Sequence, residues 1–235
     1  SQKLPGMHLV VVNDITAAAE RYASMNKYKN IDFFEIITVS SGIGNKIYDV
    51  SKGKVILDKR SIGGEMGHIK VDFSKNAPVC DCGGKGHLGA VSSGRAVERL
   101  AKENAKQHPT EFKKSYLFEK VHKPKAIINK YIVEAIKRND AFTVKILDEC
   151  TFPLASSISH VSANIGVNKF IFVGGFALNL GEPFLQSVRR NLQKVDFYNL
   201  NKHEINQLVD LGINDDNDCQ IGVGLLTQKL YASTQ

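Results

Sequence analysis

The stretch that most constrains how this chain can fold spans residues 63–89, GGEMGHIKVDFSKNAPVCDCGGKGHLG. Two imidazoles and two thiols lie close together within it: His68, Cys80, Cys82 and His87. Sulfur and imidazole donors in this number are typical ligands of a closed tetrahedral zinc site. The glycines between them permit the tight turns that such short ligand spacing requires. The pattern therefore predicts a structural zinc ion, whereas surface histidines and free thiols explain the C-x-C-G-G-K-G-H spacing less well.

Composition and cysteine usage limit the class of protein. The 235 residues are 43% hydrophobic and 23% charged, which suits one large globular domain or two small ones. No apolar run approaches the length of a membrane span, and residues 1–6 do not resemble a signal peptide. Four cysteines are too few for a disulfide framework, so we expect Cys150 and Cys219 to be buried thiols. Together these features favour the cytoplasm.

The chain carries a formal net charge of +7. A basic balance can indicate nucleic-acid binding, but the lysines are scattered and no run of like charges occurs. We therefore expect no nucleic-acid partner. A basic surface also suits a substrate that carries phosphate, such as a nucleotide.

The order of periodic segments predicts an α/β domain with a mixed sheet flanked by helices. Apolar runs at the beginning predict strands at 8–12 and 33–41, a hairpin at 45–50 and 53–58, and a strand at 68–73, with a helix at 15–25. Helical periodicity follows at 92–106, 125–138 and 141–164, with short helices at 108–123. The pattern of the remaining residues predicts a strand at 169–173, a helix at 181–193, a strand at 195–199 and a final helix at 218–231.

Three polar or glycine-rich segments follow expected strands, where α/β sheets usually build their sites. Asp14, after the first strand, is either a general base or a helix cap, and Thr16 would have to provide the cap if Asp14 is the base. Residues 40–44, SSGIG, are either a phosphate cradle or a plain hairpin turn. Gly174-Gly175 either admits a ring or phosphate to the backbone or makes a tight turn.

Three parts of the chain together resemble motifs of the ROK family (repressors, open reading frames and sugar kinases). Residues 13–19, NDITAAA, resemble the family's N-D-x-N-x-A-A, and residues 41–44, SGIG, resemble its second phosphate loop. The most specific match is G-E-M-G-H at 64–68 with C-D-C-G-G-K-G-H at 80–87. The segments at 174–175 and 216–226 resemble the family's adenosine-side elements more loosely.

The resemblance implies a fold and a set of roles. It implies an actin-like ATPase (ribonuclease H-like) lobe, with a zinc-bound loop at 63–89, that uses ATP with Mg²⁺ to phosphorylate a hexose or N-acylhexosamine. Asp14 would be the general base. The other implied roles are sugar binding by Asn13, Glu65 and His68; nucleotide binding by Ser41, Gly42, Gly44, Gly174 and Gly175; and zinc binding by His68, Cys80, Cys82 and His87.

The chain departs from the family pattern at three places. His87 stands where the family has a third cysteine, and Gly89 stands where it has a glutamate that contacts sugar. Nothing in residues 1–12 resembles the family's D-x-G-G-T phosphate loop. We therefore expect residues 1–30 to be the tail of a small N-terminal lobe and the hinge, and residues 31–235 to be the large lobe.

These departures leave several readings of the function. A lobe without the first phosphate loop should be a poor kinase by itself, so we expect completion by an N-terminal segment or a separate chain, or a homodimer. The alternatives to a kinase are a sugar-responsive transcriptional repressor of the same family and a non-catalytic sugar-binding module held by zinc. Asp14 favours the kinase because a repressor needs no base.

Overall fold

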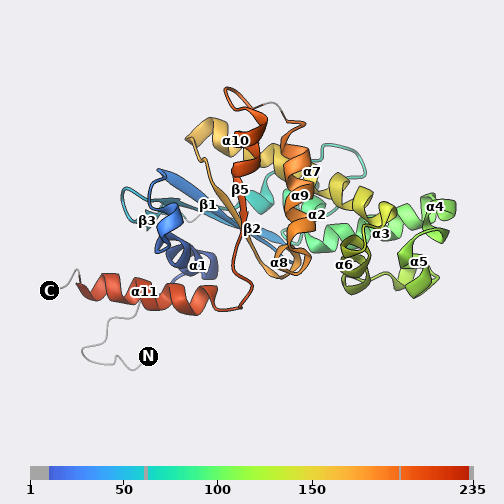
Figure 1. The fold of residues 1–235 in the computed structure, drawn as a ribbon, viewed down its shortest axis with the longest axis horizontal. Coiled ribbons are helices and arrows are strands. Elements are labelled where there is room, and N and C mark those ends of the chain that lie inside the picture. Colours follow the sequence, from blue (N-terminus) through green and yellow to red (C-terminus); the bar gives the residue numbers. More distant parts are fainter. Residues whose placement is uncertain (1–10, 61–62, 196, 233–235) are drawn as a thin grey trace.

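A five-stranded mixed sheet forms the centre of the computed structural model, which describes residues 11–60, 63–195 and 197–232. The strand order is β3-β2-β1-β4-β5 (Figure 1). The first three strands form an antiparallel meander, and β4 and β5 join it as parallel neighbours. The strand bounds are β1 Phe33–Val39, β2 Ile43–Asp49, β3 Lys54–Val55, β4 Phe170–Val173 and β5 Val209–Leu211.

Helices cover both faces of this sheet. The helices α1 and α11 lie together on one side, and most of the others form a larger layer on the opposite side (Figure 1). Their bounds are α1 Asp14–Ala23, α2 Leu88–Ser92, α3 Gly94–Gln107, α4 Pro109–Lys113, α5 Tyr116–Val121, α6 Asn129–Lys137, α7 Ala141–Ile165, α8 Gly175–Leu180, α9 Glu182–Leu192, α10 Lys202–Gln207 and α11 Asp218–Ala232.

The side-chain alternation of the central strands explains the two cores. In β1, Phe34 and Ile36 pack in the smaller core with α1, whereas Ile37 and Val39 pack in the larger core with the long helix α7. Neighbouring β4 repeats the pattern, and all four of its side chains are buried. Strands that are buried on both faces read as continuous apolar runs, which is why FFEIITV and FIFV stood out in the sequence.

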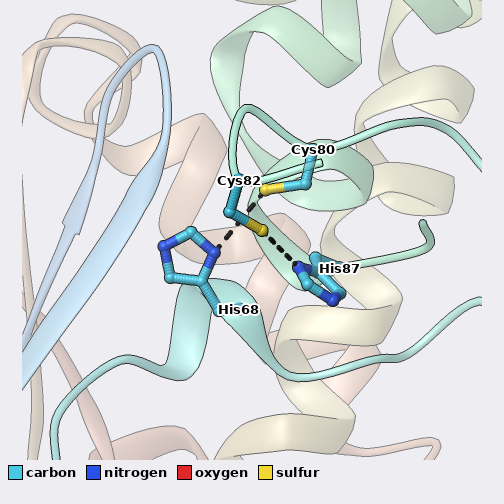
Figure 2. Close-up of side chains that lie close together, drawn as sticks. All are labelled: His68, Cys80, Cys82 and His87. Atoms are coloured by element: carbon cyan, nitrogen blue, oxygen red, sulfur yellow. Dashed lines mark hydrogen bonds between the residues drawn. The ribbon is translucent and has the colours of Figure 1, made fainter. Parts of the chain in front are cut away.

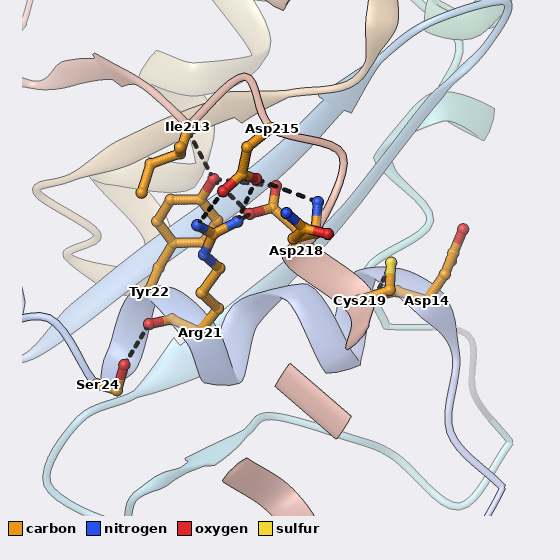
Figure 3. A network of polar contacts seen from close by, with 9 residues as sticks. Asp14, Arg21, Tyr22, Ser24, Ile213, Asp215, Asp218 and Cys219 are labelled. Carbon is orange, nitrogen blue, oxygen red and sulfur yellow. Dashed lines mark hydrogen bonds and ion pairs between the residues drawn. The ribbon is translucent and has the colours of Figure 1, made fainter. Parts of the chain in front are cut away.

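A close backbone contact and an ion-pair cluster attach α11 to α1. A Cβ on Gly222 would lie 1.7 Å from the carbonyl oxygen of Ala17, so only glycine permits this approach. Arg21 of α1 donates to Asp215 at 2.6 Å and to Asp218 at 2.8 Å (Figure 3). The carboxylates raise the pKa of Arg21 further above its ordinary value. The last helix is thereby fixed beside the start of α1, where Asp14 lies.

The α/β class, the mixed sheet and the antiparallel meander are confirmed, but two expected strands are wrong. Residues 68–73 contain the end of a 3₁₀ turn, Met66–His68, and a single bridge from Lys70 to His87. No strand occurs among the described residues of 195–199, which form a turn before α10. The backbone of Val71 and Asp72 bonds to Gly86 of the same loop and not to a strand of the sheet.

Other differences are smaller. Residues 8–10 of the strand expected at 8–12 lie outside the described residues, and residues 11–12 have no regular structure. The sequence reading missed α8, α10 and β5, which are all short. Cys150 is buried as expected, and its burial raises the pKa of the thiol to about 12. Cys219 is exposed, contrary to expectation, although its Sγ lies 3.5 Å from the carbonyl oxygen of Asp14, because Gly222 is the one buried residue among those described in α11.

Within the described ranges, no helix has both the length and the apolar character needed to cross a bilayer.

Candidate functional site

The four predicted metal ligands come together in the structure. Their donor atoms all lie within 4.8 Å of one another. Cys80 Sγ lies 3.6 Å from His68 Nδ1, and Cys82 Sγ lies 3.2 Å from His87 Nδ1 (Figure 2). Bonds of about 2.0–2.3 Å to a tetrahedral zinc ion place neighbouring donors roughly 3.3–3.8 Å apart. The donor set and its spacing therefore fit such an ion.

Glycines make the turns that bring these ligands together. Gly83 has φ +86°, and its N–H donates to the carbonyl oxygen of Cys80, which closes the tight turn around Cys82. Gly86 has φ +72°, and a Cβ there would lie 1.9 Å from the carbonyl oxygen of Asp72. Residues other than glycine rarely adopt such φ values, so the glycines of the C-x-C-G-G-K-G-H segment are needed for these turns.

Glu65 and His68 lie on one short segment, and His68 is the first of the four potential metal ligands along the chain. The 3₁₀ turn Met66–His68 follows Glu65 directly. Glu65 is half exposed, and its Oε1 lies 3.6 Å from Nζ of the buried Lys46. The segment packs against β2, because a Cβ on Gly67 would lie 2.0 Å from the carbonyl oxygen of Ile43. The two predicted sugar contacts thus stand beside the first residues of β2.

Asn13 and Asp14 lie at the start of α1, and both are exposed. The Asn13 side chain caps the helix by accepting the N–H of Ile15 at 3.0 Å. Oδ1 of Asp14 accepts the same N–H at 2.8 Å. Neither Asp14 nor Thr16, the two caps that the sequence suggested, is the N-cap of α1, because Asn13 occupies that position. Asp14 presents an exposed carboxylate in the first turn of the helix, where the helix dipole favours negative charge.

The glycine cradle, defined as Ser41, Gly42, Gly44, Gly174 and Gly175, lies between β1 and β2, at the start of β2 and directly after β4. A Cβ on Gly174, which has φ +90°, would lie 2.5 Å from Thr38 Oγ1. A Cβ on Gly44 would lie 2.7 Å from the side chain of Ile15, so this turn packs directly beside Asp14. The sheet therefore brings two sequence-distant glycine segments and the start of α1 together.

Three cavities connect these groups through shared lining residues. Asp14, Thr38, Gly174 and Gly175 line a cavity of about 190 Å³. Gly175 also lines the next, of about 490 Å³, together with Ser41, Arg95 and two lysines, Lys130 and Lys137. Arg95 in turn lines the third, of about 500 Å³, with Gly42, His68, Cys80 and Gly89. Asn13, Gly44 and Glu65 line none of these three cavities.

The sequence reading missed Arg95, which bridges two parts of the site. Its Nε donates to the carbonyl oxygen of Ser41 at 2.6 Å, and its guanidinium pairs with both carboxylate oxygens of Asp81. This pairing raises the pKa of Arg95 and lowers that of Asp81. Nothing in the sequence pairs a helix arginine with an acid between two cysteines, so only the fold reveals the bridge.

Comparison with known proteins assigns these features to a family. The ROK family model matches residues 2–229. This chain belongs to the ROK family. The match covers the metal ligands, the start of α1 and the glycine cradle together, which agrees with the resemblance found in the motifs.

Named relatives of the chain include a kinase of cyclitols. The chain is 39% identical over 222 residues to the C(7)-cyclitol 7-kinase of Streptomyces hygroscopicus subsp. limoneus. The aligned region is 94% of this chain and 62% of the relative, so the chain spans less than two thirds of that protein.

Solved structures of ROK proteins share the fold. A ROK family glucokinase from Streptomyces griseus, in complex with glucose and AMPPNP, has a TM-score of 0.73 and 23% identity, covering 94% of this chain and 69% of its own. A ROK family transcriptional regulator has the same TM-score with 20% identity, covering 97% of this chain and 53% of its own. The likeness extends to both kinases and regulators, so it establishes the fold and leaves the activity to the site.

Proposed function

We propose that this chain forms the catalytic and sugar-binding part of an ATP-dependent kinase, with Asp14 as its general base. The acceptor would be a hydroxyl of a hexose, an N-acylhexosamine or a cyclitol. The observation that carries the proposal is the exposed Asp14 carboxylate, which lines one cavity with Gly174 and Gly175. The cyclitol kinase relative supports both the reaction and the third class of acceptor.

Each proposed role uses a group that the fold makes available. Phosphoryl transfer depends mainly on positioning and charge stabilisation, so one aligned carboxylate suffices to take the proton of the attacking hydroxyl. Ser41, Gly42, Gly44, Gly174 and Gly175 would hold the nucleotide through backbone N–H groups. Bound Mg²⁺ would neutralise charge on the phosphates.

Asn13, Glu65 and His68 would bind the hydroxyls of the acceptor. Asn13 keeps its amide nitrogen available while its oxygen caps α1. Zinc held by His68, Cys80, Cys82 and His87 would be structural, because four protein ligands leave no open position for a substrate. His68 could serve both roles, since its Nδ1 faces the metal group and its other ring nitrogen remains for a hydroxyl.

The proposal extends to the organisation of the whole protein. Residues 1–30 would be the tail of a small lobe and the hinge, and residues 31–235 the large lobe. The other half of the nucleotide site would come from an N-terminal segment, a separate chain or the partner in a homodimer. Thiol ligands suit a reducing compartment, and we propose the cytoplasm.

A family repressor is the second candidate, and the transcriptional regulator with a TM-score of 0.73 favours it. A regulator would bind the sugar without turning it over. The deciding experiment incubates the full-length protein with ATP, Mg²⁺ and each of glucose, mannose, N-acetylglucosamine, N-acetylmannosamine and a C7 cyclitol, and detects ADP and the phosphorylated product. Phosphorylation of at least one acceptor supports the kinase. Binding of an acceptor with no ADP or product from any of them would overturn it.

A further inference from the structure

A fully buried acid lies beneath the segment that carries Glu65 and His68. Glu35 of β1 has no exposed surface, and its Oε1 accepts a hydrogen bond from Asn45 Nδ2 of β2. Its second oxygen, Oε2, is buried and has no hydrogen-bond partner among the described residues. Burial raises the pKa of Glu35 to about 8, so the carboxyl is largely neutral at pH 7. Neither the proposed chemistry nor the metal group uses this residue.

Asn45 connects this acid to the substrate segment. Its Nδ2 donates to Glu35, and its Oδ1 accepts the backbone N–H of Met66 at 2.8 Å. Met66 immediately follows Glu65 and begins the turn that ends at His68. The Asn45 side chain is 4% exposed, so both bonds are protected from water and are stronger than on the surface. The segment is therefore attached to the sheet at one defined backbone atom.

Lys46 holds the same segment from the other face of the sheet. Successive strand residues point to opposite faces, and Asn45 and Lys46 pair with Ile37 and Ile36, which lie in different cores. Lys46 Nζ lies 3.1 Å from the carbonyl oxygen of Gly63, a donor–acceptor distance typical of a hydrogen bond. The same nitrogen lies 3.6 Å from Glu65 Oε1. Asn45 and Lys46, neighbours in β2, therefore contact residues 63–66 from opposite faces of the sheet.

We propose that Glu35, Asn45 and Lys46 form a buried positioning unit that fixes where Glu65 and His68 stand. The unit deepens the proposed function, on which its consequence for substrate binding rests, but its effect on the segment does not depend on turnover. All three are buried and line none of the three cavities of the site, so they are positioning residues. A buried acid with an unpaired oxygen costs stability relative to an apolar pair, and defined geometry is what such a polar unit can offer in return.

The proposal predicts a graded effect of substitutions. Asn45→Leu removes both bonds and leaves the Met66 N–H without its acceptor, so the segment should move. Glu35→Leu removes only the acceptor for Asn45 Nδ2 and should act in the same direction more weakly. Glu35→Gln is the matched control, because its amide oxygen can still accept from Asn45 at nearly the same volume. Lys46→Met tests the other face, with Lys46→Arg as its conservative partner.

The first readout needs no substrate. Hydrogen–deuterium exchange of the full-length protein should show faster exchange in residues 63–68 for Asn45→Leu and Lys46→Met, with unchanged exchange in β4 and α7. Titration with Co²⁺, followed by its visible absorption, should show at least about tenfold weaker binding for Asn45→Leu because His68 is displaced. Glu35→Gln should match the wild type in both measurements.

The second readout separates binding from chemistry. For the acceptor that the wild type phosphorylates, Asn45→Leu should raise KM about tenfold or more and leave kcat within about threefold, because Asp14 and the cradle are unaffected. If the wild type phosphorylates nothing, the kinase proposal fails, and exchange and Co²⁺ affinity still decide this one. Should Asn45→Leu not fold, Glu35→Leu and Lys46→Met carry the test. Wild-type exchange in 63–68 and wild-type Co²⁺ affinity in the folded variants overturn the unit.

Discussion

The metal loop, residues 63–89, and the glycine cradle reach the same site by different means. The loop has little regular structure. Side chains organise it: four potential metal ligands that lie together, and the contacts of Asn45 and Lys46. The cradle is held by close packing around glycines, above all at Gly174, where a positive φ and contacts with Thr38 and the backbone of Val39 leave no room for a Cβ. The loop should therefore respond to chelation and the cradle to added methyl groups, whereas pH should act on Glu35 of β1, which lies next to the loop. Predictions that treat the two regions separately test this difference.

Removal of the metal should have the largest effect on the stability of the fold. A bound ion at about 1,000 times its Kd stabilises the folded state by about 4 kcal/mol, which corresponds to a Tm change of about 10 °C at this size. Chelation or Cys82→Ser should lower Tm by about that amount, measured by calorimetry with metal analysis. Cys219→Ser is the control, because this thiol is exposed and outside the metal group. Freshly purified protein without metal would contradict the prediction.

Raising the pH should lower the free energy of unfolding, because Glu35 is buried as a neutral acid. Below pH 4.5 the carboxyl is protonated in both the folded and the unfolded state. Between pH 4.5 and about 8 only the unfolded chain ionises, because burial raises the folded pKa to about 8. The free energy of unfolding should therefore fall as pH rises, by at most about 1.4 kcal/mol per pH unit. Urea unfolding at pH 6, 7 and 8 measures this slope, which should shrink by that amount in Glu35→Gln. An equal slope in both proteins would refute it.

A methyl group added in the glycine cradle should destabilise the fold without changing metal binding. Gly174→Ala places a Cβ 2.5 Å from Thr38 Oγ1 at a φ of +90°, so it should destabilise the fold by about 1–3 kcal/mol and weaken nucleotide binding. Gly42→Ala is the matched control for stability and metal content, because its Cβ would meet nothing within 4 Å. Denaturant unfolding and metal analysis of both variants check this. Loss of metal from Gly174→Ala would break the separation between the two regions.

The bridge between the two regions should have the smallest effect on stability. Arg95 joins Asp81 of the metal loop to Ser41 of the cradle, but the Arg95 and Asp81 side chains are 56% and 72% exposed. Exposed ion pairs contribute about 0–1 kcal/mol, so Arg95→Gln should change the free energy of unfolding by less than about 1 kcal/mol. High salt should reduce the difference further. A change of several kcal/mol would mean that the regions are not independent.

Much of the fold followed from the sequence because the central strands are buried on both faces. The continuous apolar runs predicted β1 and β4, and the spacing of His68, Cys80, Cys82 and His87 predicted a group that the structure does bring together. The expected strand at 68–73 failed because its backbone bonds go to the metal loop itself, as in the bridge from Lys70 to His87.

The remaining site features depend on contacts between distant residues. Asn13 as the cap of α1 reflects a competition among neighbouring polar side chains that composition does not decide. The hydrogen bonds that run from Glu35 through Asn45 to the backbone of Met66 join residues whose separation in sequence carries no pattern. An acid within an apolar strand is the one signal that could have pointed to it.

The central claim is that Asp14 is the general base of a phosphoryl transfer, and Asp14→Asn tests it most directly. In the full-length protein, the variant should bind the acceptor with near wild-type affinity, measured by calorimetry, because the metal loop is unchanged. Its kcat should fall by at least about 100-fold, because the amide cannot take the proton of the hydroxyl. Turnover within a few-fold of the wild type would contradict the account.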